Sequence, residues 1–168
     1  MSFVSSAIQE DLSKRDFGLN RILQEYDLEV QDYLEEASEY IMYNSKYDWW
    51  RRYADYQGIN YTKIDSSGND VIAFDPDKLL KKSKSLIDIH CFYTLYLIYR
   101  TISTDIEAPF ATAMKNAEMW LKEFNTYFNR LEKVDDIYDI DGDGKTELSE
   151  HRRITAENSL RYGNRWIR

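Results

Sequence analysis

The sequence lacks the features that mark secreted and membrane proteins. It has one cysteine, Cys91, in 168 residues, so an internal disulfide is impossible, and we predict that this thiol is a buried small hydrophobe. The first residues show no basic region before an apolar one, which predicts no secretory signal. The longest apolar run, residues 91–99, is too short to span a bilayer. We therefore expect a soluble protein, made in a reducing cytoplasm and without a membrane partner.

Catalytic signatures are also missing. The sequence has no phosphate-binding glycine loop, no histidine cluster for a metal and no nucleophile with a neighbouring base. His90 stands alone in an apolar stretch, so we interpret it as a hydrogen-bonded core residue rather than a catalytic or metal-binding one. The sequence therefore predicts that the chain is not an enzyme.

Acidic residues outnumber basic ones except at one end. The net charge of −8 argues against a nucleic-acid-binding protein. Residues 151–168 nevertheless contain five arginines and one acidic residue, a charge of +4 that leaves −12 for residues 1–150. A short basic end on an acidic body is typical of an interaction arm. A solvated helix end and a nucleic-acid-binding tail are the alternatives.

Aromatic residues are abundant and make up 15% of the chain. Tyrosine and tryptophan are favoured where surfaces are buried against partners, although most such rings fill protein cores. Trp49 and Trp50 adjoin Arg51 and Arg52, a combination enriched in interface hot spots. We predict a partner-binding patch there, with core packing as the competing explanation.

Hydrophobic spacing predicts helices in the first third of the chain. We expect a short helix near residues 6–14, and a longer one that begins behind an N-cap at Asp27 and runs to about Asn44. Residues 47–53 are interpreted as an irregular continuation of the longer helix. The segment between the two helices is expected to be anchored by Phe17, Leu19, Ile22 and Leu23. The solvated face of the longer helix carries Glu29, Asp32, Glu35, Glu36 and Glu39.

The spacing of the hydrophobic residues changes in the middle of the chain. Two β-prone runs within residues 59–74 surround a polar turn, which predicts a hairpin. Asp75 and Pro76 are typical of a helix start, and the helix should run to about Ser103 as a central helix that is apolar nearly all round. A long amphipathic helix should then lead up to residue 139. Its apolar positions are Phe110, Ala113, Ala117, Trp120, Leu121, Phe124, Phe128 and Leu131.

Residues 139–150 fit the twelve-residue EF-hand calcium loop. Gly144 holds position 6, where the chain must turn sharply, and calcium prefers the hard oxygens that the other positions supply. The predicted calcium ligands are Asp139, Asp141, Asp143, the backbone carbonyl of Lys145, Glu147 through water, and Glu150 with both carboxylate oxygens.

The surroundings of the loop do not favour a calcium switch. Thr146 takes the position where sensors usually carry an aliphatic residue that pairs with a second loop, and the chain has no second loop. Asp135 replaces a usual apolar packing residue, and His151 and Arg152 follow where a switch would need apolar side chains. We therefore expect a structural ion that sets the angle of the basic tail. A calcium-responsive regulatory protein, a calcium-dependent enzyme subunit and a plain Asp/Gly-rich surface turn are the alternatives.

Two regions of the sequence resemble the head-to-tail adaptor, or connector, proteins of tailed bacteriophages. The likeness covers about residues 25–50 and 80–125 and departs after Phe124. It lies in the following stretches: Ala37-Ser38 to Ile41 with Tyr47-Asp48, Leu86-Ile87-Asp88-Ile89-His90, Tyr96-Leu97-Ile98-Tyr99-Arg100, Ile102-Ser103, the acidic linker with Pro109, and Ala113 through Ala117-Glu118-Met119-Trp120-Leu121-Lys122.

The resemblance implies a virion structural protein at the head–tail interface. Relatives of this kind form a ring, usually a dodecamer, between the portal protein and the next neck or tail protein, and DNA passes through the ring. C-terminal arms in the family often reach into the portal. An acidic body suits a channel along which DNA must slide without sticking. The arm residues expected to bind a partner are Arg152, Arg153, Arg161, Arg165, Trp166 and Arg168.

The predicted fold class is therefore mainly α. It is a helical bundle with a long central helix and one small β-hairpin insertion, followed by an EF-hand-like loop and an extended arm. The predicted divisions are residues 1–138 for the helical domain, 139–150 for the calcium loop and 151–168 for the basic C-terminal helix and arm.

Overall fold

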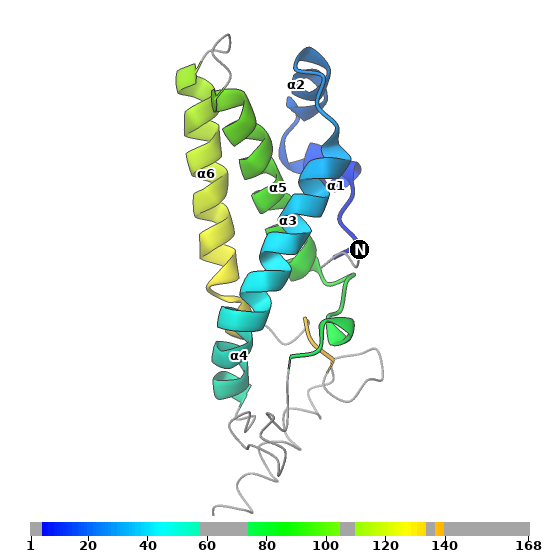
Figure 1. The fold of residues 1–168 in the computed structure, drawn as a ribbon, viewed down its shortest axis with the longest axis vertical. Coiled ribbons are helices and arrows are strands. Elements are labelled where there is room, and N and C mark those ends of the chain that lie inside the picture. The colour runs from blue at the N-terminus through cyan, green and yellow to red at the C-terminus, as the bar shows by residue number, and fades with distance from the viewer. Residues whose placement is uncertain (1–4, 58–73, 105–109, 134–136, 140–168) are drawn as a thin grey trace, which may run out of the picture.

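A computed structural model of the protein describes residues 5–57, 74–104, 110–133 and 137–139. The described chain is mainly helical, as predicted, and its only extended pairing is an isolated antiparallel bridge between Leu79 and Tyr138. The predicted hairpin lies outside these ranges except for Phe74. Figure 1 shows the long helices side by side along the long axis of the molecule. The elements in chain order are α1 (Gln9–Arg15), α2 (Leu19–Glu25), α3 (Val30–Asn44), a π-helical turn (Ser45–Trp49), α4 (Trp50–Gln57), a 3₁₀ turn (Pro76–Lys78), α5 (Lys84–Thr104), α6 (Phe110–Phe128) and a second 3₁₀ turn (Leu131–Lys133).

The central helix is α5, as its all-round apolar character predicted. It packs against α6, α3 and α1. Every residue from Ile89 to Leu95 is buried, and seven consecutive buried residues leave no solvated face over two turns. Asp88, on the more accessible side of this stretch, forms an ion pair with Arg15 of α1.

The helix α5 begins later in the chain than the predicted start at Asp75 and Pro76. Asp75 does cap a helical turn, since its Oδ1 accepts the backbone N–H of Asp77 at 3.0 Å, but that turn is a single 3₁₀ turn. The chain then runs extended, because the backbone around Leu79 bonds to residues 137–139. The α-helix begins at Lys84, where the Ser83 carbonyl accepts the Ile87 N–H at 3.0 Å.

Asp27 ends one helix rather than starting the next. Its φ of 50° is left-handed, and the Leu28 N–H donates to the Leu23 carbonyl at 2.9 Å. This is the Schellman arrangement that closes a helix C-terminus, here the end of α2. The predicted N-cap role of Asp27 is therefore wrong, and α3 begins at Val30. Phe17 is likewise no anchor, since it is 94% exposed, whereas Leu19 and Leu23 are buried.

A π-helical turn joins α3 to α4 and explains the irregular continuation predicted there. A π turn adds one residue to the helical repeat, so the face that follows is rotated. Asp48 and Arg52, which the α3 repeat would turn inward, instead form an ion pair at 2.9 Å outside the core. Trp49 and Tyr53 are turned inward in their place.

The packing of α6 follows the predicted spacing. Phe92 of α5 stacks on Trp120 with ring centroids 5.8 Å apart, and Tyr93 contacts Phe124 at 4.8 Å. The helix ends at Phe128, so the prediction that it continues to residue 139 is wrong. No helix among the described residues combines the length and the apolar character needed to cross a membrane.

Candidate functional site

An aromatic cluster fills the end of the bundle where α4 meets the segments around residues 74 and 138. The Trp49 and Tyr53 ring centroids are 4.7 Å apart, and those of Trp50 and Tyr138 are 4.9 Å apart. Trp49 is 1% exposed and Trp50 is 5% exposed. Core packing therefore describes both tryptophans, and they do not form the surface patch for a partner that the sequence predicted.

Residues 137–139, which lead into the predicted calcium loop, are extended and hydrogen-bonded to residues 78–80. The Leu80 N–H donates to the Ile137 carbonyl at 3.0 Å, and the Asp139 N–H donates to the Lys78 carbonyl at 2.9 Å. The Tyr138 hydroxyl accepts the Asp75 N–H at 3.1 Å, and burial raises the pKa of Tyr138 to about 12. An EF-hand loop normally follows a helix directly. Here the helix before the loop is replaced by a bridge to residues 78–80.

Asp139 is the predicted calcium ligand that the structure describes. It is 6% exposed, and it stands at position 1 of the loop. Within the described ranges, no group of three His, Cys, Asp or Glu side chains is placed to hold a metal ion. The remaining ligands, Asp141, Asp143, Lys145, Glu147 and Glu150, lie outside those ranges, as do Arg152, Arg153, Arg161, Arg165, Trp166 and Arg168 of the arm.

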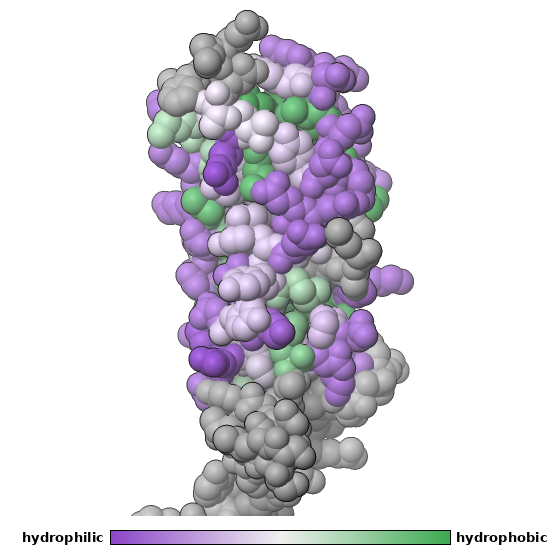
Figure 2. All heavy atoms as spheres, viewed as in Figure 1, coloured by the Kyte–Doolittle hydropathy of each residue, from purple (hydrophilic) through white to green (hydrophobic). Residues whose placement is uncertain are grey.

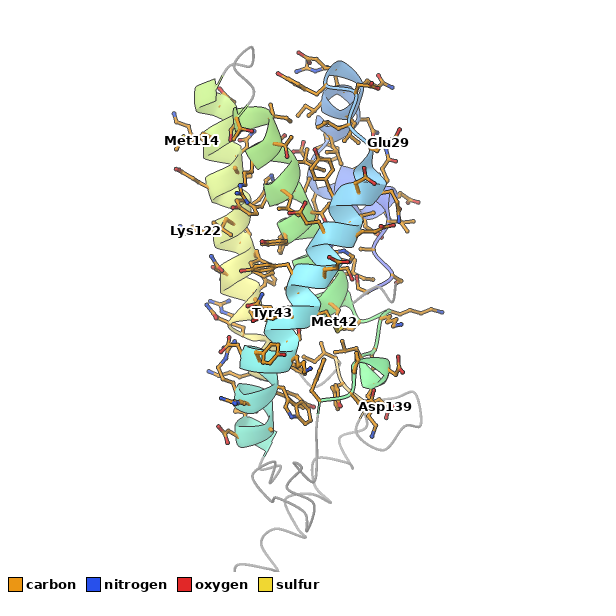
Figure 3. The ribbon with its side chains drawn as sticks, viewed as in Figure 1. Glu29, Met42, Tyr43, Met114, Lys122 and Asp139 are labelled. Carbon is orange, nitrogen blue, oxygen red and sulfur yellow. The ribbon has the colours of Figure 1, made fainter. Side chains whose placement is uncertain are left out.

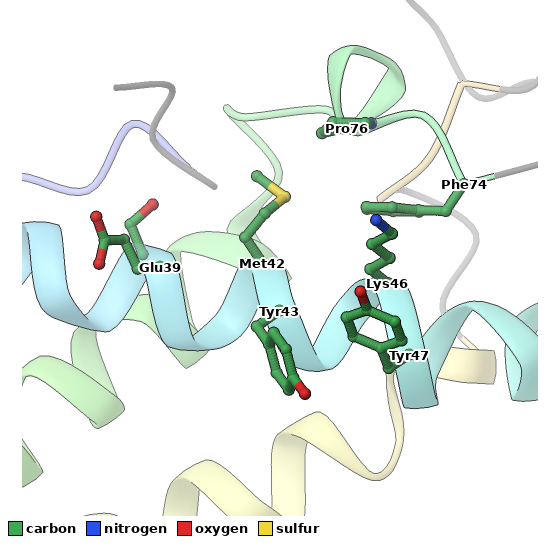
Figure 4. Close-up of a pocket in the computed structure, with 8 residues that line it drawn as sticks. Glu39, Met42, Tyr43, Lys46, Tyr47, Phe74 and Pro76 are labelled. Atoms are coloured by element: carbon green, nitrogen blue, oxygen red, sulfur yellow. The ribbon is translucent and has the colours of Figure 1, made fainter.

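A surface groove that the sequence analysis missed lies beside the aromatic cluster. It has a volume of about 480 Å³, and it runs between the C-terminal half of α3 and the strap at Phe74 and Pro76 (Figure 4). Met42 and Phe74 contribute apolar surface, while Glu39 and Lys46 add one charge of each sign. Sequence spacing could have placed Met42, Tyr43 and Lys46 on one helical face. It could not have shown that residues 74–76 form the opposite wall.

The face of α3 that leads to this groove is acidic. Glu29, Asp32, Glu36 and Glu39 are all exposed, and none of them forms an ion pair with another described residue. Figure 3 shows Glu29 at one end of α3, and Met42 and Tyr43 towards the other. Hydrophilic residues cover most of the face drawn in Figure 2, with small hydrophobic patches between them. The exposure of these four carboxylates agrees with the solvated face predicted for this helix.

His90 is a hydrogen-bonded core residue, as predicted. Its Nε2 lies 2.8 Å from the Leu34 carbonyl oxygen and its Nδ1 lies 2.8 Å from the Ser5 hydroxyl. A carbonyl can only accept, so Nε2 carries the proton and Nδ1 accepts from Ser5. Burial lowers the pKa of His90, although its bond to Leu34 opposes this. The neighbouring Cys91 is fully buried, and burial raises the pKa of its thiol to about 12, so it is unreactive.

Comparison of the chain with family models, with curated proteins and with solved structures finds no match.

Proposed function

We propose that the chain is a head-to-tail adaptor of a tailed bacteriophage. In this proposal copies of the chain form a ring between the portal and the next neck or tail protein, and the ring extends the DNA channel. The observation that carries the proposal is the likeness at residues 80–125. Its two halves occupy α5 and α6, which pack against each other as the framework of the bundle. A framework of two long, closely packed helices suits a structural role.

The electrostatics support the same role. Residues 1–150 carry −12 in total, so few DNA phosphates would be neutralised by this part of the chain. The basic residues 151–168 are the arm proposed to grip the portal, because arginine and tryptophan make strong anchors in desolvated pockets.

The proposed calcium ion is structural. The bridge at residues 137–139 holds the entry to the loop against residues 78–80, and a sensor would need that entry to move. An ion bound at 139–150 would then set the direction in which the arm leaves the bundle.

Electron microscopy of the purified chain, alone and mixed with its cognate portal rings, tests the adaptor role. We expect rings that dock coaxially on the portal. Docking should be lost in Arg161→Glu/Arg165→Glu and retained in Arg51→Glu/Arg130→Glu, which makes the same charge change at two exposed arginines of the bundle. A strict monomer in both samples would overturn the proposal.

A further inference from the structure

The groove on α3 combines an apolar floor with an acidic approach. Met42, Phe74 and Pro76 line the groove, and Tyr43 and Tyr47 stand beside them with exposed fractions of 65% and 54%. Asp32, Glu36 and Glu39 follow one another at spacings of four and three residues, which places them on one helical face. An occupant that suits this surface has apolar or aromatic side chains beside several positive charges.

The acidic row is electrostatically unbalanced. Carboxylates three or four residues apart on a helix repel one another, and such pairs weaken the helix unless a counter-charge is near. The described residues form no ion pair with Asp32, Glu36 or Glu39. Lys46 is the cation that lines the groove, and its Nζ lies 5.2 Å from the centroid of the Tyr47 ring.

The chain itself contains a segment of matching chemistry. Residues 151–168 carry five arginines and one acidic residue, and they include the adjacent Trp166 and Ile167. Arginine guanidinium groups pair with carboxylates and also stack on tyrosine faces, so both parts of the α3 surface suit this segment.

The last described residues before the segment lie close to the groove. Tyr138 stacks on Phe74, with ring centroids 6.1 Å apart, and Phe74 is part of the groove wall. The chain from Asp139 to His151 can span up to about 40 Å when extended. These residues form a tether that begins beside the groove and is long enough to reach it. The tether gives residues 151–168 a high effective concentration at the groove of their own chain, so binding there is favoured over binding to a second copy.

We propose that residues 151–168 of the free protein bind the α3 groove of their own chain. Trp166 and Ile167 lie against Met42, Phe74 and Pro76, and the arginines pair with Asp32, Glu36 and Glu39. This contact goes beyond the adaptor role and does not depend on it. The contact would keep residues 151–168 on the groove until a partner with a more favourable surface binds them instead.

Photo-crosslinking in the full chain tests this contact. Ile167 is replaced by benzoylphenylalanine, which reacts readily with methionine, and the crosslinked residue is located by mass spectrometry. We expect crosslinks to Met42 within a band of monomer size. Met114 and Met119 on α6 serve as internal controls, because they are 45% and 46% exposed and neither lines the groove.

Charge reversal decides whether the acidic row directs the contact. Glu36→Lys/Glu39→Lys should reduce the Met42 crosslink several-fold, and so should raising the salt concentration from about 0.05 to about 0.5 M. Glu25→Lys/Glu118→Lys, which changes two exposed acids elsewhere by the same charge, should leave it unchanged. Circular dichroism confirms that each variant is folded. Crosslinks confined to a dimer band, crosslinks that favour Met114 or Met119, or equal yields in the two charge variants would overturn the proposal.

Discussion

The Nε2 atom of His90 in α5 lies 2.8 Å from the carbonyl oxygen of Leu34 in α3. This bond joins the central helix to its neighbour inside the core, where His90 has no exposed surface. Because Nδ1 also bonds to Ser5, both ring nitrogens are used when the imidazole is neutral. A second ring proton would displace the Ser5 hydroxyl as a donor.

The first prediction is a loss of stability on acidification. Burial lowers the pKa of His90 below 6.5 in the folded chain, so the unfolded chain binds a proton first as the pH falls. The His90 contribution is therefore present above pH 6.5 and declines below it, until the folded-state pKa is reached. Denaturant unfolding measured from about pH 7.5 to about pH 5 should show this decline. His90→Gln should make the free energy of unfolding depend less on pH, and His151→Gln should leave the decline unchanged. Equal slopes in both variants would contradict the assignment.

The second prediction concerns Asp27. Glycine adopts a left-handed backbone at little cost, whereas residues with a Cβ are strained there. Asp27 has a φ of 50°, so Asp27→Gly should raise the free energy of unfolding by up to about 1 kcal/mol, and Asp27→Val should lower it. An N-cap role would give the opposite sign for glycine, since replacing Asp by Gly at an N-cap costs a few tenths of a kcal/mol. Urea titration of the two variants distinguishes these roles.

The third prediction is that Trp49 supports the core rather than an interface. Trp49→Ala should lower the free energy of unfolding by about 3–5 kcal/mol, because it leaves a cavity among Trp50, Tyr53 and Tyr138. Tyr47→Ala is the matched control, since Tyr47 lies two residues away and is 54% exposed. We expect its effect to stay within about 0.5 kcal/mol. Similar losses in the two variants, measured by chemical denaturation, would argue against the core role.

The fourth prediction is one calcium ion for each chain. Calorimetric titration should give a stoichiometry of about one, as for a single loop. Asp139→Ala/Glu150→Ala should abolish the binding heat, because these residues hold the first and last positions of the loop. Glu25→Ala/Glu118→Ala removes two acids elsewhere and should leave binding intact. Undiminished binding in the loop variant would place the ion at another site.

Calcium should also leave the exposed apolar surface unchanged. The loop entry is held by the bridge at residues 137–139, so binding of a polarity-sensitive dye should not rise when calcium is added. A large calcium-dependent rise would favour the regulatory alternative over a structural ion.

The sequence by itself determined the helical class and the two helices that frame the bundle. Apolar residues on every side of α5 require a surrounded helix, and the spacing of Ala113, Ala117, Trp120 and Phe124 turns one face of α6 towards it. These are local patterns, and burial of apolar surface is the dominant force that acts on them.

Tertiary structure decided the features that depend on pairing between distant segments. The late start of α5 follows from the bridge between Leu79 and Tyr138, which joins residues far apart in the chain and keeps the backbone before Lys84 extended. Trp49, buried by the π turn, and Phe74, in the groove wall, both contact the Tyr138 ring of this bridge. Asp27 shows the limit of local signals, since an aspartate suits both a helix start and a left-handed helix end. The structure shows which role it takes, since the Leu28 N–H bonds to the Leu23 carbonyl and Asp27 therefore ends α2.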